Sequence, residues 1–368
     1  MSDSTAIVHY WLITMRGGEK VIEALLELFP QADIYTHVYD PAHISDTINT
    51  HKVFTSSINK LPFAKKLYQK YMPLMPKALM EFNLQQYDLI ISSESGPAKG
   101  VVPNPNAYHI CYCHSPMRYL WDMYHEYFRK ANPLVRFFMN TMIPNLRLWD
   151  VCSANLVDCF VANSSYVAKR IARYYNRKAE IVFPPVAIEK FISIERKPED
   201  FYLFFGQLTG YKRADLAISA CISSGRKLVV AGAGAKQKDI KHYEKTGLVT
   251  FLGRISDKEI ADYFSRARAL LFPGIEDFGI IPVEANSAGC PVIAYRAGGI
   301  LDTVKENVTG IFFNEQTQSS LISAMVEFEK NEYQFNNRRI EFTNHVEQFS
   351  KRAFLSKMNK IIEKKERK

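Results

Sequence analysis

Short apolar runs alternate along the chain with stretches whose apolar residues recur at helical spacing. The first run, residues 6–10, is followed by Gly17 and Gly18, and then by apolar positions from Val21 to Phe29 that lie three or four residues apart. This pattern predicts a strand, a glycine turn and a helix. Further strands are expected at residues 88–92, 108–113, 159–162 and 180–183. The alternation is typical of an α/β layer with a parallel sheet.

A second series of the same kind follows a break in the pattern. Pro184 and Pro185 end the first series, and a charged segment at 195–200 precedes the next one. The second series predicts strands at 202–205, 227–231, 249–252, 269–272 and 292–295, and helices at 214–222 and 258–266. We therefore expect two doubly wound, Rossmann-like domains, 1–185 and 186–345. The segment 346–368 is expected to be one helical stretch that returns to the first domain or stays in solvent.

Ligands of doubly wound folds bind outside the carboxyl ends of the strands, so a cleft between the two domains is the expected site. The net charge of +9 indicates an anionic partner, unless it serves solubility alone. Six cysteines without a C-x-x-C pair favour a reduced, cytosolic protein. No signal peptide is visible, and no apolar run is long enough to predict a transmembrane helix.

Two glycine-containing loops are candidate phosphate sites. Gly17 and Gly18 follow a predicted strand and open a helix, which lets backbone N–H groups approach an anion; a tight turn without a ligand is the alternative. In "GQLTGYKRADLA", residues 206–217, Lys212 and Arg213 stand where the next helix begins. Cations oppose the helix dipole there, which favours a diphosphate partner over a merely solvated pair.

The stretch "GIEDFGIIPVEANSAGCP", residues 274–291, places Glu276 and Glu284 on either side of a predicted helix start. Pro282 suits the first turn of that helix, so the residues at 279–281 are expected to offer free N–H groups to an anion. Carboxylates accept hydrogen bonds from vicinal hydroxyls. One ligand with a phosphate between two hydroxylated rings, a nucleotide sugar, would fit. The alternative is that the acidic residues only cap the helix.

With the following strand, this stretch reads "GIEDFGIIPVEANSAGCPVIA" and resembles the E-x7-E signature of retaining glycosyltransferases of family 4, which have the GT-B fold. The resemblance covers most of the chain. It includes Gly17-Gly18-Glu19, "CHSP" at 113–116, "FVANSSYVAKRI" at 160–171, Gly206 with Lys212, and "FLGRIS" at 251–256. Within the family, the chain resembles most the bacterial O-antigen and exopolysaccharide mannosyltransferases.

The resemblance implies roles for the matching residues. Glu276 would hold hydroxyls of the donor sugar and Glu284 those of the ribose. The other implied contacts are the phosphates or sugar for Gly17 and Gly18, the donor sugar for His114, the leaving diphosphate for Lys212, the base for Arg254 and Ile255, and sugar and phosphate for the backbone of Phe278, Gly279, Ile280 and Ile281. Gln207 stands where the family usually has Arg, so the phosphate clamp is either weaker or completed by Arg213.

No metal cofactor is expected. The chain has no D-x-D pair, the usual ligand of a metal-dependent transferase, and Lys212 with helix-terminal N–H groups can stabilise a departing phosphate instead. His109, Cys111, Cys113 and His114 raise a zinc alternative, but a spacing of two within a strand suits buried packing better. The family's front-face mechanism, in which the leaving phosphate helps to deprotonate the acceptor, leaves no general base to assign.

Two segments predict contact with a lipid-linked acceptor and an anionic membrane. The segment 62–72 is amphipathic, with lysines opposite an aromatic stripe, and 117–149 mixes eight aromatic residues with arginines and a lysine. Ordinary helices packing on the core are the alternative. The predicted location is the cytoplasmic face of the bacterial plasma membrane, and no nucleic acid is expected as a partner.

The sequence therefore favours a hexosyltransferase that moves mannose from GDP-mannose to a lipid-linked glycan. A UDP-sugar donor, a sugar epimerase or phosphorylase of the same fold, and a nucleotide- or nucleic-acid-binding protein remain alternatives. A dehydrogenase is disfavoured, because residues 232–234 lack the third glycine of the dinucleotide fingerprint.

Overall fold

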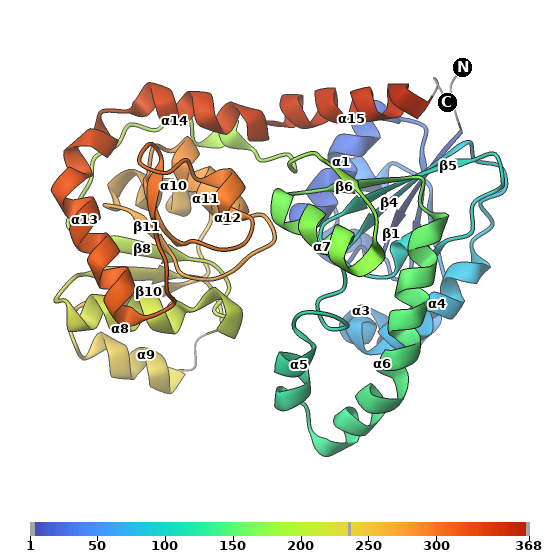
Figure 1. The fold of residues 1–368 in the computed structure, drawn as a ribbon, viewed down its shortest axis with the longest axis horizontal. Helices are drawn as coiled ribbons and strands as arrows, with labels where there is room; N and C mark the ends of the chain where they lie inside the picture. The colour runs from blue at the N-terminus through green and yellow to red at the C-terminus, as the bar shows by residue number, and fades with distance from the viewer. Residues whose placement is uncertain (1–3, 235–236, 366–368) are drawn as a thin grey trace. The chain divides into compact units, whose positions relative to one another are not determined.

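The computed structural model describes residues 4–234 and 237–365. The chain divides into two compact units (Figure 1). Unit 1 comprises Met1–Pro185 and Phe354–Lys368, and unit 2 comprises Val186–Ala353. The C-terminal segment differs from the expected single helix. After α14 (Arg339–Val346) come a 3₁₀ turn (Glu347–Phe349) and a separate helix, α15 (Lys351–Lys365); the residues up to Ala353 belong to unit 2 and those from Phe354 to unit 1.

Unit 1 is built on a seven-stranded parallel sheet in the order β3-β2-β1-β4-β5-β6-β7. The chain leaves β1 on one side to form β2 and β3 and then returns to β4 on the other side, which is the doubly wound topology. The strands are β1 (Thr5–His9), β2 (Asp33–Thr36), β3 (Val53–Thr55), β4 (Leu89–Glu94), β5 (Tyr108–Cys113), β6 (Cys159–Ala162) and β7 (Ala179–Ile181). The main helices are α1 (Gly17–Leu28), α5 (Tyr124–Lys130), α6 (Pro133–Ser153) and α7 (Ser165–Tyr175).

Both faces of this sheet are covered, so its central strands are apolar on both sides. Ile7 packs with α1 and with the apolar side of α15 on one face. Its neighbours Ala6 and Val8 pack on the other face, against the segment around Phe82. This two-sided burial explains why β1 appears in the sequence as a continuous apolar run.

Unit 2 repeats the topology with a six-stranded parallel sheet in the order β10-β9-β8-β11-β12-β13. Its strands are β8 (Tyr202–Phe205), β9 (Leu228–Ala231), β10 (Val249–Gly253), β11 (Leu270–Phe272), β12 (Val292–Tyr295) and β13 (Gly310–Phe313). The helices are α8 (Ala214–Ser223), α9 (Gln237–Glu244), α10 (Asp257–Arg266), α11 (Ile280–Ser287), α12 (Ile300–Thr303) and α13 (Gln318–Asn336), besides α14.

The unit 2 sheet is also covered on both faces. Helices α8 and α13 pack on one face, and α10, α11 and α12 pack on the other (Figure 1). Strand residues alternate between these two cores, so that Leu271 faces α8 and α13 while Leu270 and Phe272 face α10 and α11. The loops after β8 and β11 are thereby fixed at the carboxyl edge of a rigid sheet.

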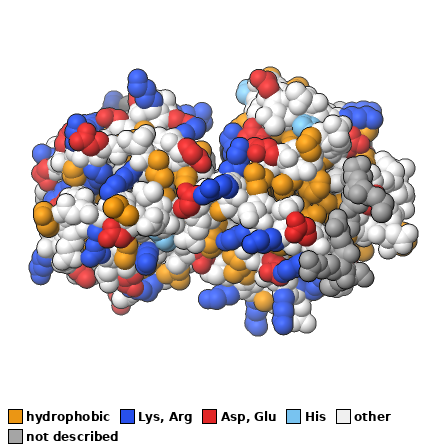
Figure 2. All heavy atoms as spheres, turned by 90° about the horizontal axis from the view of Figure 1, so that it is seen from above, with side chains coloured by type: hydrophobic (Ala, Val, Ile, Leu, Met, Phe, Trp, Pro, Cys, Tyr) orange, Lys and Arg blue, Asp and Glu red, His pale blue; other side chains and the backbone are white. Residues whose placement is uncertain are grey.

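The surface carries charge of both signs. Lys and Arg side chains are spread over the face seen in Figure 2 and are interleaved with Asp and Glu. In the described part of the chain, no helix combines the length and apolarity that crossing a membrane requires. The amphipathic stripe of 62–72 mostly packs on the core: Ala64 is buried, Tyr68 and Tyr71 are partly buried, and only Phe63 projects, with 72% of its surface exposed.

Candidate functional site

Lys212 and Glu276 form an ion pair in unit 2. Lys212 ends a 3₁₀ turn (Gly210–Lys212) after β8, and Glu276 lies in the loop after β11. Lys212 Nζ is 2.8 Å from Glu276 Oε1, although the angles are not those of a hydrogen bond, and both side chains are mostly buried. Gly274 makes this contact possible, since a Cβ atom there would lie 2.6 Å from Lys212 Cα. Two loops that are far apart in sequence thus bring opposite charges together at the carboxyl edge of the sheet.

Two consecutive glycines, Gly298 and Gly299, pack against the backbone of the Glu276 loop. The Gly299 amide donates a hydrogen bond of 2.8 Å to the Glu276 carbonyl oxygen. A Cβ atom at Gly298 would lie 2.6 Å from the same oxygen, so only glycine allows this close approach. Phe278, two residues after Glu276, is buried and contacts the Phe349 ring. The backbone around Glu276 is therefore fixed by packing.

Gly279 caps the N-terminus of α11 with a φ of 95°, a conformation that favours glycine. The first residues of the helix, Ile280 and Ile281, carry N–H groups that have no partner within a helix, and Pro282 has no N–H at all. Glu284 lies in the second turn of α11. Glu276 precedes the helix start and Glu284 follows it, with the N-terminal backbone between them.

Glu284 has two charged neighbours that the sequence did not predict. Burial raises the pKa of Glu284 to about 7; the negative charge of Asp257 acts in the same direction, and Lys190 acts against it. Lys190 Nζ lies 2.6 Å from the Asp257 carboxylate, and both its bond to Asp257 and the charge of Glu284 raise the pKa of Lys190 although burial opposes them. Glu284 therefore takes up a proton close to neutral pH.

Arg254 and Ile255 follow β10 and lead into α10, whose N-cap is Ser256. Arg254 is exposed and Ile255 is partly buried. Asp257, the first residue of that helix, connects this segment to the Glu284 neighbourhood through Lys190. Arg254 and Ile255, which the resemblance assigns to the base, therefore lie just before Asp257. The charge of Asp257 acts on Glu284, which the resemblance assigns to the ribose.

The two remaining residues of the predicted phosphate clamp do not join the Lys212–Glu276 pair. Gln207 is exposed after β8. Arg213 adopts a left-handed conformation, with a φ of 56°, and its guanidinium donates hydrogen bonds of about 3.1 Å to Asp215. Gly206, in contrast, adjoins the pair, since a Cβ atom there would lie 3.1 Å from Lys212 Nζ.

In unit 1 the structure brings Gly18 and His114 together. Gly17 and Gly18 begin α1, and His114 follows β5. A Cβ atom at Gly18 would lie 3.6 Å from His114 Nε2 and 3.4 Å from atoms of His9 and Tyr10. His114 Nε2 is 2.8 Å from the Ser93 hydroxyl. The Gly17–Gly18 turn therefore packs against the side chains of His9, Tyr10 and His114 at the carboxyl ends of the unit 1 strands.

The residues of the zinc alternative have other contacts. His109 Nδ1 donates to the Leu156 carbonyl oxygen at 2.9 Å, and its Nε2 is 2.8 Å from the Ser92 hydroxyl. Cys111 and Cys113 are buried. Among residues 4–234 and 237–365, no group of three His, Cys, Asp or Glu side chains is arranged to hold a metal ion. The contacts of His109 account for it as a packed core histidine.

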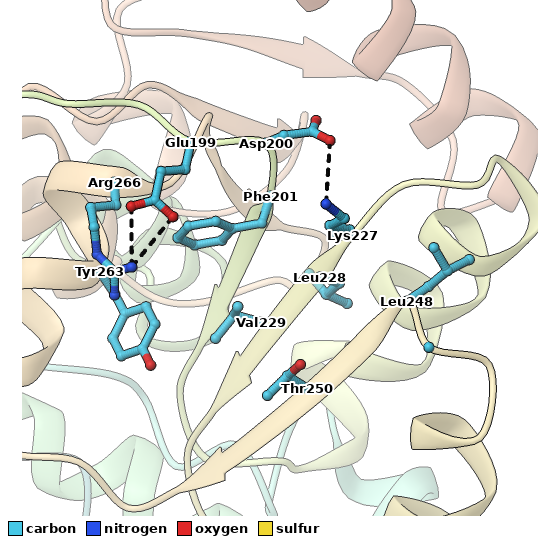
Figure 3. A pocket seen from close by; sticks show the side chains of 11 residues that line it. Glu199, Asp200, Phe201, Lys227, Leu228, Val229, Leu248, Thr250, Tyr263 and Arg266 are labelled. Atoms are coloured by element: carbon cyan, nitrogen blue, oxygen red, sulfur yellow. Dashed lines mark hydrogen bonds and ion pairs between the residues drawn. The ribbon is translucent and has the colours of Figure 1, made fainter.

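A pocket of about 330 Å³ lies elsewhere in unit 2 (Figure 3). It is formed at the amino ends of β8, β9 and β10, where Arg266 pairs with Glu199 and Lys227 with Asp200. None of the predicted site residues lines it. Those residues follow the carboxyl ends of strands, so this pocket and the candidate site are at opposite edges of the sheet.

Two doubly wound, all-parallel sheets in tandem match the GT-B fold of solved glycosyltransferase structures. Residues 15–190 match the family model described as Glycosyltransferase Family 4, and residues 186–363 match the model described as Glycosyl transferases group 1. Together the two matches extend from residue 15 to residue 363, so both units of the chain match glycosyltransferase domains of the GT-B type.

Known relatives and structures agree with this assignment. The human alpha-1,3/1,6-mannosyltransferase ALG2 is 25% identical over 194 residues, which cover 43% of this chain and 47% of ALG2. The chain spans about half the length of the curated relatives it matches.

Two solved structures match nearly the whole chain. Anabaena HepE in complex with UDP and glucose has a TM-score of 0.68 and 16% identity, with 97% of this chain and 99% of that chain covered. WaaG, a glycosyltransferase involved in lipopolysaccharide biosynthesis, has a TM-score of 0.67 and 14% identity, with the same two coverages. At these identities the structures establish the fold.

Proposed function

We propose that this protein is a retaining hexosyltransferase that moves mannose from GDP-mannose to a lipid-linked glycan. The observation that carries the proposal is the Lys212–Glu276 pair before the N-terminus of α11, with Glu284 one turn inside that helix. This arrangement offers a cation and backbone N–H groups to a diphosphate, and a carboxylate on either side to hydroxylated rings. The ALG2 match supports mannose as the sugar.

In the proposed complex, Lys212 exchanges its partner. Without a donor, its charge is balanced by Glu276. A bound diphosphate would take over the ammonium group, and the Glu276 carboxylate would turn to hydroxyls of the sugar. When the glycosidic bond breaks, negative charge builds up on the leaving phosphate, and Lys212 with the N–H groups of Ile280 and Ile281 would stabilise it without a metal ion.

Unit 1 supplies the second part of the proposed machinery. Gly17 and Gly18 offer backbone N–H groups at the start of α1, and their lack of side chains lets a phosphate or sugar approach closely. His114, with its Nε2 oriented by Ser93, would contact the donor sugar. The leaving phosphate itself would accept the proton of the acceptor hydroxyl.

The lipid-linked acceptor is supported by a surface of unit 1. Helices α5 and α6 carry exposed apolar side chains next to the cations Arg129 and Lys130. The exposed residues are Tyr127, Leu134, Val135, Phe137, Phe138 and Leu148. An apolar surface with cations at its edge suits an anionic bilayer. We propose that this surface holds the protein at the membrane where a lipid-linked glycan is found.

The test is a donor screen, because a UDP-sugar is the strongest alternative: the HepE structure contains UDP and glucose. GDP-mannose, UDP-glucose, UDP-galactose and UDP-N-acetylglucosamine are compared by calorimetry and by turnover. Preferential use of GDP-mannose is expected. Preference for a UDP-sugar would overturn the mannose assignment and keep the transferase. A free epimer or a sugar phosphate formed without an acceptor would overturn the transferase.

Two variants then separate the glutamates. Glu276→Gln keeps the side-chain shape and is expected to lower kcat at least about 100-fold, with little change in donor affinity, because its hydroxyl contacts serve the reacting sugar. Glu284→Gln is expected to weaken nucleotide binding about 10-fold or more, since a hydrogen bond to a charged group contributes about 1.5–3 kcal/mol. Glu306→Gln, a change on the surface of unit 2, serves as the control. Normal turnover by Glu276→Gln would refute the assigned role.

A further inference from the structure

The turn at Gly17 and Gly18 is connected to the sheet by two buried residues to which the proposed function gives no role. His9 is the last residue of β1 and Glu19 lies in the first turn of α1. His9 is 1% exposed and Glu19 is 3% exposed. Burying a carboxylate costs free energy unless it is paired, so the burial of Glu19 beside His9 needs an explanation.

The contacts of His9 fix where its proton lies. Nδ1 is 2.9 Å from the backbone carbonyl oxygen of Ser93. A carbonyl oxygen only accepts, so Nδ1 must carry the hydrogen. The other nitrogen, Nε2, faces Glu19 with 3.7 Å to Oε1, and it has no hydrogen-bond partner among the described residues. A lone pair facing a carboxylate is repelled by it, whereas a proton on Nε2 makes the contact attractive.

Glu19 ties this contact to the glycine turn. Its Oε2 accepts a hydrogen bond of 2.9 Å from the backbone N–H of Arg16, directly before Gly17. Burial acts to raise the pKa of Glu19, but the interactions with His9 and with the Arg16 backbone outweigh it and lower the pKa overall. The carboxylate is thus charged, and its two oxygens connect the turn to His9.

The same group of contacts reaches His114. The Ser93 carbonyl oxygen fixes His9, and the Ser93 hydroxyl lies 2.8 Å from His114 Nε2. Gly18 lies above both rings: a Cβ atom there would be 3.4 Å from His9 Cε1 and 3.6 Å from His114 Nε2. A shift of the Gly17–Gly18 turn toward or away from the two rings therefore changes the distance between Gly18 and His114.

We propose that Glu19 and His9 are positioning residues that set the distance between the Gly17–Gly18 turn and His114. Neither residue touches the donor; both act through the turn and through Ser93. The inference rests on the proposed function, in which the turn and His114 bind the donor. A displacement of about 1 Å in such a group costs on the order of 100-fold in rate, so a buried pair that fixes it has a catalytic purpose.

Four variants test the inference through kinetics. Glu19→Ala removes both contacts and is expected to lower the kcat/KM for the donor by about 10- to 100-fold. Glu19→Gln keeps an acceptor for the Arg16 N–H and is expected to recover most of that loss. His9→Asn keeps a donor for Ser93 but loses Nε2, and should resemble Glu19→Ala. Glu23→Gln, on the same helix and paired with Lys20, should leave kcat/KM unchanged.

The result that overturns the proposal is a Glu19→Ala protein that unfolds at a lower temperature but has the wild-type kcat/KM per folded molecule. That outcome would assign Glu19 a structural role only. Recovery by Glu19→Gln of thermal stability without recovery of kcat/KM would also contradict the proposal.

A second measurement does not need a substrate, and so separates this inference from the proposed function. NMR of protein labelled with ¹⁵N-histidine is recorded for wild type and variants, with His9 identified by its loss in His9→Asn. We expect a proton on Nδ1 of His9, and a change in the His114 ring signals in Glu19→Ala but not in Glu23→Gln. A neutral His9 with its proton only on Nε2, or unchanged His114 signals, overturns the inference. Absence of turnover with every donor, together with the expected spectra, would refute the proposed function alone.

Discussion

Glu284→Gln is expected to stabilise unit 2 at neutral and alkaline pH. Burial, together with the charge of Asp257, raises the pKa of Glu284 from 4.5 to about 7, in spite of the opposing charge of Lys190. Folding at high pH therefore transfers a carboxylate out of water into a place that disfavours its charge. Glutamine has the same shape without the charge, so the folded variant avoids this cost.

The direction and the size of this stability difference follow from the protons that Glu284 binds in the folded and the unfolded state. Below pH 4.5 the carboxyl group is protonated in both the folded and the unfolded state, and it costs nothing. Between 4.5 and about 7 the folded state keeps a proton that the unfolded state has lost, so the stability of the wild type falls as the pH rises. Above about 7 the full cost applies. At about 1.36 kcal/mol per pH unit, this interval corresponds to about 3 kcal/mol.

The assay is thermal unfolding of both proteins between pH 4.5 and 8.5, followed at the transition of unit 2. About 3 kcal/mol corresponds to roughly 6–12 °C for a unit of this size. The two melting temperatures should agree near pH 4.5 and diverge as the pH rises. Glu306→Gln is the control with the opposite sign, because the hydrogen bonds from Arg296 lower the pKa of Glu306, although burial opposes them.

Parallel curves for wild type and Glu284→Gln across this range would refute the reasoning. Lys190→Gln provides an independent check. Without the Lys190 charge, the pKa of Glu284 should rise further and the protein should lose stability at pH 8. The same substitution should cost less in the Glu284→Gln background, and equal costs in the two backgrounds would show that Lys190 and Glu284 do not interact.

Three further changes test the structure outside that site. Gly232→Ala should prevent unit 2 from folding, because the new Cβ atom would lie 1.9 Å from a carbonyl oxygen, whereas Gly225→Ala, with open space around it, should cost about 1 kcal/mol in urea unfolding. Lys99→Met should destabilise unit 1 by about 3–5 kcal/mol in the same assay, since it leaves the fully buried Asp150 carboxylate without its cation. The double change Phe137→Ser and Phe138→Ser should reduce binding to anionic vesicles in flotation; unchanged binding would remove these exposed side chains from the membrane proposal.

Most strands could be predicted from the sequence, including the edge strands β7 and β10, but three could not. Strands β5, β6, β8 and β12 have the expected residues because two-sided burial requires continuous apolar runs. Strands β2, β3 and β13 were missed. β3 has three residues, all only partly buried, at the edge of its sheet. A strand of that kind is defined by backbone pairing with a distant segment, and no local pattern carries that information.

The same distinction applies to the site. Lys212 and Glu276 each follow a strand near a glycine, and parallel strands place such loops at one edge, so their proximity could be anticipated. The neighbours of Glu284 could not, because Lys190 comes from a segment far away in sequence. The sequence left open whether Arg213 completes the phosphate clamp, and it did not predict that its guanidinium pairs with Asp215, two residues further on. Motifs identify the groups that carry the chemistry, and tertiary contacts determine their charge.

Glu284 reduces the stability of unit 2 at the pH where the proposed function needs it charged. A carboxylate accepts two hydroxyls of a ribose, whereas a protonated carboxyl group loses part of that capacity. Nucleotide affinity should therefore fall as the pH falls below about 7, the value near which Glu284 takes up its proton. The positive charge of Lys190 lowers the pKa of Glu284 and so opposes protonation, although Lys190 is not one of the groups proposed to contact the ribose hydroxyls. We propose that Lys190 serves to keep Glu284 ionised at neutral pH. Without Lys190, nucleotide affinity should already begin to fall at a higher pH. The pair would then represent a stability cost retained for binding.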